Sequence, residues 1–276
     1  MSKENIYFIT FGGGGKNYID AGERLIRQAQ KTGFFTKTIL YTDQQLKNDQ
    51  SFWSQHGDFI MTNKRGYGYW LWKPYIIKKT METMNDGDIL LYLDSGCEIG
   101  GSKNNILKKY LDLIKNYKIL FNATDYVEGT WDKMDLIDYL KITDRPEILT
   151  SGQHEAGAIM LLVCDSNKKL ITDWYSISNN YHLIDDSPSN KPNLPNFREH
   201  RHDQSVFSLL TKKNNIRTKF NTQNCVHCIR NRTGQSTIKL ETFISNDRKS
   251  KNNSLIIFII LLLIIIIIIL IITIKK

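Results

Sequence analysis

The stretch Asp88-Ile89-Leu90-Leu91-Tyr92-Leu93-Asp94-Ser95-Gly96-Cys97-Glu98 is the part of the chain around which the rest can be arranged. Its residues 89–93 are all apolar or aromatic, as in a short buried strand, although a piece of buried helix has the same composition. Turn-forming residues on both sides favour the strand. In an open α/β sheet, ligands bind beyond the carboxyl ends of the strands. We therefore expect Asp94 to meet a metal ion or polar ligand, the alternative being that it only begins a turn.

Strand and helix patterns alternate on both sides of this stretch and predict an α/β fold. Strands are expected at 5–11 and 36–42, with an amphipathic helix at 17–31 between them. This βαβ spacing is typical of a parallel sheet. Further strands are predicted at 118–123, at the apolar end of 151–163 and at 216–220. Further helices are predicted at 44–55, 75–84, 104–115 and 167–180, with a last one whose first turn contains Asp203.

The net charge of +9 is spread along the 276 residues, with basic residues scattered among acidic ones. A nucleic-acid surface usually shows clustered Lys and Arg, so nucleic acid is not an expected partner. The excess indicates attraction to anionic substrates or lipid headgroups. Four cysteines include a single Cys-x-x-Cys at 225–228, which lacks the second pair of ligands that a structural zinc site needs.

The C-terminal end is unbroken apolar sequence from Leu255 to Ile272 and remains largely apolar to Ile274. About 20 such residues span a bilayer as a helix, whereas a core helix of that length would show a polar stripe. The N-terminus shows no apolar region of the signal-peptide type. We therefore expect a globular domain at 1–245, a polar linker at 246–254 and a transmembrane helix at 255–274. This helix would anchor the chain by its tail, with the domain in the cytosol.

Residues 63–74 combine two Tyr, two Trp, two Gly and three cations within twelve positions. Aromatic rings can stack on a nucleotide base while Lys or Arg meets its phosphates. The alternative is an aromatic core cluster that opens the next helix. We expect Trp70 and Trp72 to be core residues, whereas Lys64, Arg65 and Lys73 are harder to explain as packing.

A second polar segment opens the last predicted helix. His200, His202 and Asp203 are all candidate metal ligands or proton carriers. Helix capping is the alternative for Asp203, but capping does not require two His and two Arg beside it. His154 and Glu155 lie at the start of a buried strand, where each taken alone would more often be a solvated loop residue.

In their order along roughly residues 5–221, these features resemble nucleotide-sugar-dependent glycosyltransferases of the GT-A fold, most of all the small glycan transferases of bacteria and giant viruses. The resemblance implies a mixed, mostly parallel central sheet flanked by helices. It also implies hexosyltransferase-like transfer of a sugar from a nucleotide sugar to a glycan or other hydroxyl acceptor. The segments that carry it are Gly-Tyr-Gly-Tyr-Trp-Leu-Trp-Lys-Pro at 66–74, Tyr-Leu-Asp-Ser-Gly at 92–96, Glu-Ala-Gly-Ala-Ile-Met-Leu at 155–161 and His-Arg-His-Asp-Gln-Ser at 200–205.

The metal motif of that family is Asp-x-Asp at the end of the central strand, and here Gly96 stands at its third position. The resemblance implies a divalent cation, Mn²⁺ or Mg²⁺, with Asp94 as a ligand and His202 among the residues that could complete the shell; Lys73 and Arg65 could instead supply the positive charge. Asp203 takes the place of the catalytic base, and Glu155 is a second catalytic candidate. The candidates for binding the nucleotide sugar are Phe11, Gly12, Lys64, Arg65, Tyr69, Lys73, Asp94 and Gly96.

Two other classes of protein stay open at this point. A non-catalytic, tail-anchored binding or scaffold protein on a degenerate transferase fold would account for the missing second Asp and the Ile-rich tail. A nucleotidyltransferase would share the sheet and a phosphate site. It usually needs a glycine-rich basic loop after the first strand, and here only Lys16 follows Gly12 to Gly15.

Overall fold

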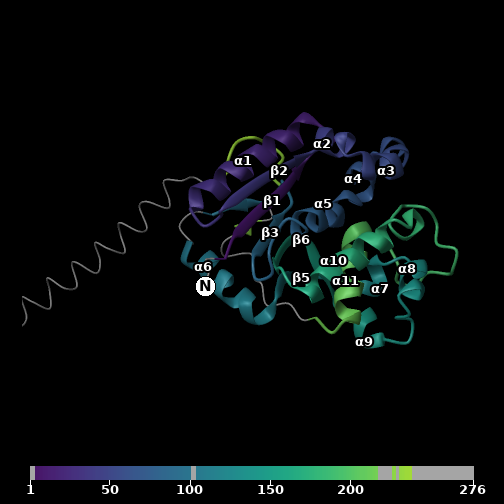
Figure 1. Cartoon of the computed structure of the whole chain (residues 1–276). Helices are drawn as coiled ribbons and strands as arrows, with labels where there is room; N and C mark the ends of the chain where they lie inside the picture. Colours follow the sequence, from purple (N-terminus) through teal and green to yellow (C-terminus); the bar gives the residue numbers. More distant parts are fainter. Residues whose placement is uncertain (1–3, 101–103, 217–225, 228–229, 238–276) are drawn as a thin grey trace, which may run out of the picture.

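A computed structural model describes residues 4–100, 104–216, 226–227 and 230–237. They build a five-stranded sheet in the order β2-β1-β3-β6-β5 (Figure 1). β1 is parallel to β2 and β3, whereas β6 is antiparallel to both of its neighbours, β3 and β5. Four strands therefore run in one direction, so the predicted mixed, mostly parallel sheet is confirmed, with 89–93 at its centre. The strands are β1 (Ile6–Gly12), β2 (Lys37–Thr42), β3 (Ile89–Leu93), β5 (Ile119–Val127) and β6 (Gly152–Leu162).

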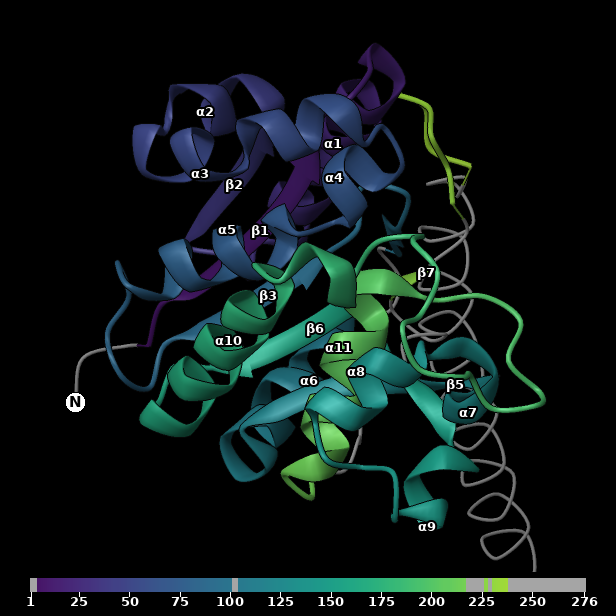
Figure 2. The same cartoon turned by 90° about the vertical axis from the view of Figure 1, so that its right-hand side faces the viewer.

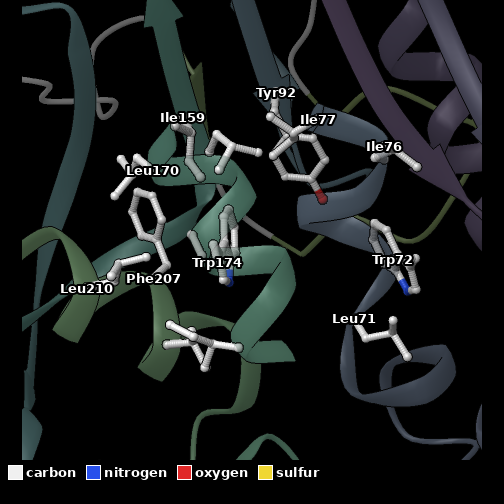
Figure 3. Packing of buried hydrophobic residues seen from close by; sticks show 14 of the residues in the cluster. Leu71, Trp72, Ile76, Ile77, Tyr92, Ile159, Leu170, Trp174, Phe207 and Leu210 are labelled. Atoms are coloured by element: carbon white, nitrogen blue, oxygen red, sulfur yellow. The ribbon is translucent and has the colours of Figure 1, made fainter. Parts of the chain in front are cut away.

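Helices cover both faces of this sheet because successive strand side chains point to opposite sides. On one face Phe8, Leu91 and Met160 pack with α1 (Lys16–Thr32) and α6 (Asn104–Tyr117). On the other, Leu90, Tyr92 and Ile159 belong to the larger core with α5 (Trp72–Met81), α10 (Asp165–Ser178) and α11 (His202–Lys213), which lie in front of the sheet in Figure 2. Figure 3 shows Trp174 and Phe207 side by side within that core, where their ring centroids lie 4.8 Å apart.

Individual residues set the ends of the first three helices. α1 ends at Gly33, whose φ of 70° is the left-handed conformation that glycine adopts without strain. The helix predicted at 44–55 is two helices, α2 (Asp43–Asn48) and α3 (Gln50–Thr62). They separate at Asp49, which has an extended backbone and a carboxylate that binds Ser51, Tyr75 and Lys79. The prediction of one helix was wrong, because hydrophobic periodicity does not reveal that Asp49 has an extended backbone.

The aromatic segment before α5 forms a compact turn, α4 (Gly66–Tyr69), with an unusual backbone. All five residues from Gly66 to Trp70 have positive φ, between 51° and 83°. This conformation costs roughly 1–2 kcal/mol for each residue with a Cβ. Gly68 has no room for a larger residue, since a Cβ there would lie 2.7 Å from Ile60 Cγ1. The turn lets α5 begin at Trp72, three residues earlier than predicted, with Trp72 in the core and Trp70 half-buried against it.

Short elements complete the domain: α7 (Glu128–Trp131), α8 (Met134–Tyr139), α9 (Pro146–Leu149) and the 3₁₀ turn η2 (Tyr181–Leu183). Trp131 ends α7, and the polar residues before the apolar end of 151–163 are themselves part of β6. β4 (Glu98–Ile99) pairs antiparallel with β7 (Val226–His227). The segment 185–196 contains neither helix nor strand.

None of the helices formed by the described residues combines the length and the apolar character needed to cross a bilayer. The predicted transmembrane helix at 255–274 and the linker at 246–254 lie outside the described residues, as does most of the strand predicted at 216–220. The cysteines at 225 and 228 also fall outside them.

Candidate active site

A cavity of about 730 Å³ lies at the carboxyl ends of β1 and β3. This volume is within the range of small-molecule binding sites. Seven Lys and Arg residues but only four Asp and Glu residues line it. Nine of the eleven predicted site residues are among its lining, namely Phe11, Lys64, Arg65, Lys73, Asp94, Gly96, Glu155, His202 and Asp203.

Lys73, Asp94 and Asp203 form an ion-pair cluster in this cavity. The Lys73 ammonium lies 2.6 Å from Asp203 Oδ2 and 3.2 Å from Asp94 Oδ1. Lys73 and Asp203 are buried, whereas the Asp94 side chain is 42% exposed. Tyr92 also donates a hydrogen bond to Asp94 Oδ1, over 2.5 Å. Three elements supply the cluster, because Lys73 opens α5, Asp94 ends β3 and Asp203 lies in the first turn of α11. The N-cap residue of α11 is Arg201, so Asp203 is not its capping residue.

Burial sets the protonation of this cluster. Burial raises the pKa of Asp203 to about 6, although the charge of Lys73 opposes the shift. Burial alone would lower the pKa of Lys73, but Asp203 and Asp94 outweigh it and raise the pKa above its ordinary value. Lys73 is therefore a permanent cation, and Asp203 exchanges its proton near neutral pH.

Asp94, Glu155 and Gly157 all line the cavity. A Cβ built at Gly157 would lie 3.1 Å from Asp94 Oδ2 and 3.5 Å from Glu155 Oε1. Gly157 is next to Asp94 because its carbonyl accepts the Asp94 backbone N–H, over 2.8 Å. The other Glu155 oxygen accepts a hydrogen bond from Asn122 Nδ2, over 3.0 Å, which holds the carboxylate in place. Two carboxylates thus face one space with hydrogen-bond acceptors suited to hydroxyl groups.

Glycines also line the cavity. Gly13, Gly14 and Gly15 line it directly after β1, where the missing side chains let a ligand approach the backbone. Phe11 stacks on Trp72 with ring centroids 3.8 Å apart. Gly12 does not line the cavity, because it packs against α1, where a Cβ would lie 2.8 Å from the Tyr18 carbonyl oxygen.

The structure places Arg65, Tyr69 and His202 in one wall away from the ion-pair cluster. Arg65 makes ion pairs with Asp186 and Glu199 of the 185–200 loop. His202 stacks on Trp70, and its Nδ1 lies 2.8 Å from the Ile184 carbonyl oxygen. Burial lowers the pKa of His202 to about 4. Tyr69 is buried against His202, with ring centroids 5.0 Å apart, and does not line the cavity.

The described side chains do not fit a protein-built metal centre. Across these residues no three His, Cys, Asp or Glu side chains gather closely enough to hold a metal ion. Lys73 and Tyr92 already occupy Asp94 Oδ1, and His202 Nδ1 faces a backbone carbonyl. The cation that lies beside Asp94 is the Lys73 ammonium. No step of a reaction is therefore assigned to a metal ion.

Gly157, Arg201, Arg230 and Arg232 are four of the lining residues that the predicted site did not include. Gly157 lies inside a predicted strand, and its role depends on the strand beside it. Arg201 is adjacent to two predicted site residues, and its guanidinium lies 4.2 Å from the centroid of the Tyr126 ring. Arg230 and Arg232 belong to a polar segment without periodic pattern, so no signal in the sequence indicates that they line the cavity.

No protein-family model matches the sequence, and no curated protein matches it. Among solved structures, the chain is similar to mouse xyloside xylosyltransferase 1 (TM-score 0.42, 9% identity, 79% of this chain and 85% of that one). It is also similar to the galactosyltransferase LgtC (TM-score 0.42, 12% identity, 74% and 70%). A third is a glycosyltransferase involved in glycosylation of the major capsid of PBCV-1 (TM-score 0.35, 12% identity, 63% and 66%). At these values the similarities carry no argument of their own.

Proposed function

We propose that this protein is a glycosyltransferase that moves a sugar from a nucleotide-sugar donor to a hydroxyl group of a glycan or other acceptor. The observation that carries the proposal is the Lys73 ammonium held between Asp94 and Asp203 at the carboxyl end of the central strand. A buried lysine of this kind places a fixed positive charge where a leaving group develops negative charge.

The cavity has a wall suited to each part of such a donor. The glycine loop after β1 and the nearby aromatic rings suit the nucleoside. The excess of Lys and Arg suits the diphosphate. The space at Gly157, between Asp94 and Glu155, suits the hydroxyl groups of a sugar. Residues of all three regions line the same cavity, as binding of one nucleotide sugar requires.

The proposed reaction breaks the bond between the anomeric carbon and the diphosphate oxygen. The electron pair leaves with the diphosphate, whose new charge Lys73 stabilises. The acceptor oxygen forms the new bond to the anomeric carbon and loses its proton to a carboxylate. Asp203 is our first candidate for this base because a pKa of about 6 lies close to neutral pH. Glu155 is the second, since it is less buried and faces the Gly157 space.

The two candidate bases can be separated by pH profiles. Asp203→Asn and Glu155→Gln keep the side-chain size and remove the carboxylate. The variant that loses the base lowers kcat and also loses the acidic limb of the kcat–pH profile. A variant that only weakens binding raises KM and keeps the shape of that profile.

We also propose, from the apolar tail alone, that residues 255–274 hold this domain at a membrane with the domain in the cytosol. Digestion of the 1–245 domain by protease added outside sealed, oriented membranes supports this orientation. Protection of the whole domain under the same conditions contradicts it.

The function is tested with the full-length chain in a mild detergent and a panel of nucleotide sugars. The measurement is release of the nucleoside diphosphate, with and without candidate acceptors. Asp94→Asn is expected to abolish release, whereas the matched control Asp112→Asn, an exposed residue of α6, retains it. Binding of donors without any release would favour the non-catalytic binding protein. Wild-type turnover in Asp94→Asn would remove Asp94 from the site.

A further inference from the structure

The segment 230–237, here called the strap, lies against the turn that follows the central strand. The Asn231 backbone N–H donates to the Gly96 carbonyl, over 2.9 Å. A Cβ built at Gly96 would lie 3.1 Å from Arg230 Cα, which is closer than a side chain is normally accommodated against backbone. Gly96 stands where the second Asp of an Asp-x-Asp motif would be. The strap therefore occupies the space that a second carboxylate needs.

Arg24 of α1 fastens the strap to this turn. Its guanidinium is buried, with 3% of the residue exposed. One nitrogen donates to the carbonyls of Asn231 and Thr233, over 3.0 and 2.5 Å. The other donates to the carbonyls of Ser95 and Cys97, over 2.8 and 2.7 Å. A single buried cation thus binds the strap and the Asp94 turn at once. Figures 1 and 2 both show the strap, in yellow-green, beside α1.

Glu98 fastens the strap from the other side. Its carboxylate is fully buried and accepts hydrogen bonds from Asn231 Nδ2, Ser236 Oγ and the Thr237 N–H and hydroxyl. Burial would raise the pKa of Glu98, but these hydrogen bonds together lower it to about 2. Arg24 and Glu98 are therefore a buried cation and a buried anion that both hydrogen-bond to the strap.

The strap carries two exposed arginines at the cavity. Arg230 and Arg232 both line it, together with Asp94 and the glycine loop. Arg230 has a φ of 54°, an unfavourable conformation that the surrounding contacts maintain. The Arg232 guanidinium lies 5.4 Å from the centroid of the Tyr18 ring. Within the part of the chain that the structure describes, neither guanidinium has a carboxylate partner, unlike Arg65 in the opposite wall.

We propose that Arg230 and Arg232, held by the Arg24–Glu98 fastening, bind the diphosphate of the donor and supply, with Lys73, the positive charge that a divalent cation would otherwise provide. The proposal rests on the proposed function. A guanidinium offers paired N–H donors that match two phosphate oxygens, and it stays charged at all working pH values. Three fixed cations around one diphosphate replace a metal that the described residues are not arranged to hold.

The test is calorimetric binding of ADP, GDP, CDP, UDP and the matching monophosphates to the full-length chain in mild detergent. Each titration is run in EDTA and again with Mn²⁺. We expect one diphosphate to bind in EDTA, with Mn²⁺ changing its affinity by less than about threefold. Arg230→Gln and Arg232→Gln should each weaken diphosphate binding by about tenfold or more. Binding of the monophosphate should change much less, because it lacks the β-phosphate.

Arg145→Gln is the matched control, since it removes the same charge from an exposed site in another part of the domain. Arg24→Met tests the fastening: it should lower diphosphate affinity although Arg230 and Arg232 are intact. Because Arg24→Met also removes hydrogen bonds from α1 to the Asp94 turn, the double variant Arg230→Gln/Arg232→Gln, at two exposed positions, is the decisive test. Diphosphate binding that requires Mn²⁺ and is unchanged in the double variant overturns the proposal.

The binding titrations and the nucleotide-release assay together separate this proposal from the proposed function. Arginine-dependent diphosphate binding in EDTA without any sugar transfer would leave the strap proposal standing and remove the transferase. Sugar transfer that requires Mn²⁺ and ignores both arginines would do the reverse.

Discussion

Lys73→Met is the substitution whose effect on stability follows most directly from the site. It keeps an unbranched stem and removes the ammonium that lies 2.6 Å from the buried Asp203. Removing one partner of a buried ion pair costs about 3–5 kcal/mol, because the other charge is left without compensation. Asp94 is half-exposed and can be hydrated, so Asp203 bears most of this cost.

The loss of unfolding free energy in Lys73→Met should depend on pH, and the direction of that dependence follows from the Asp203 pKa. That pKa is about 6 with Lys73 in place, above the ordinary 3.8, and it rises further without Lys73. Between the unfolded and folded pKa values the native state holds a proton that the unfolded chain has released. Stability therefore falls as pH rises through this window. We expect a small loss near pH 5, where Asp203 is protonated, and the full loss at pH 8.

Thermal unfolding of the full-length chain at pH 5 and pH 8 measures this difference. For a domain of this size 1 kcal/mol corresponds to about 2–4 °C, so Lys73→Met should lower Tm by about 6–20 °C at pH 8. The double variant Lys73→Met/Asp203→Asn should regain more than half of that fall, since it no longer buries a charge. Equal losses at both pH values, or no recovery in the double variant, would refute the assignment of the stranded charge to Asp203.

Two further predictions concern the cavity and the acid stability. Gly157→Ala should reduce sugar transfer about tenfold or more, because its methyl group would occupy the space between Asp94 and Glu155; Tm should change little, and normal transfer would show that the sugar binds elsewhere. Burial lowers the pKa of His154 to about 3, so only the unfolded chain takes up its proton below about pH 6.5. His154→Gln should therefore flatten the fall of unfolding free energy with acidification by ~1.4 kcal/mol per pH unit, and parallel curves for variant and wild type would contradict this.

The sheet was predictable because its strands are local apolar runs. Residues 89–93 became the central strand with the predicted bounds, and the unit formed by β1, α1 and β2 is parallel as expected. Lys73, Asp94 and Asp203 were each singled out by composition and position. Their meeting in one ion-pair cluster was not predictable, since it depends on where α5 and α11 pack against the sheet.

Contacts between residues distant in sequence could not be predicted. Arg65, a candidate phosphate ligand, makes ion pairs with Asp186 and Glu199 of the 185–200 loop. His202, a candidate metal ligand, stacks on Trp70 and lies beside the Ile184 carbonyl. The strap has no periodic sequence pattern that predicts its position. Arg24 and Glu98, which are distant from it in sequence, hold it in place.

The late position of the strap has a consequence for shortened forms of this protein. A chain that stopped just before Arg230 would keep every strand of the main sheet and the Lys73–Asp94–Asp203 cluster. Such a chain would lose the strap donors and acceptors that pair with the buried Arg24 and Glu98, so we expect it to be less stable. It would also lack the two arginines at the cavity. The amount of a shortened product would therefore say little about its capacity to bind a diphosphate.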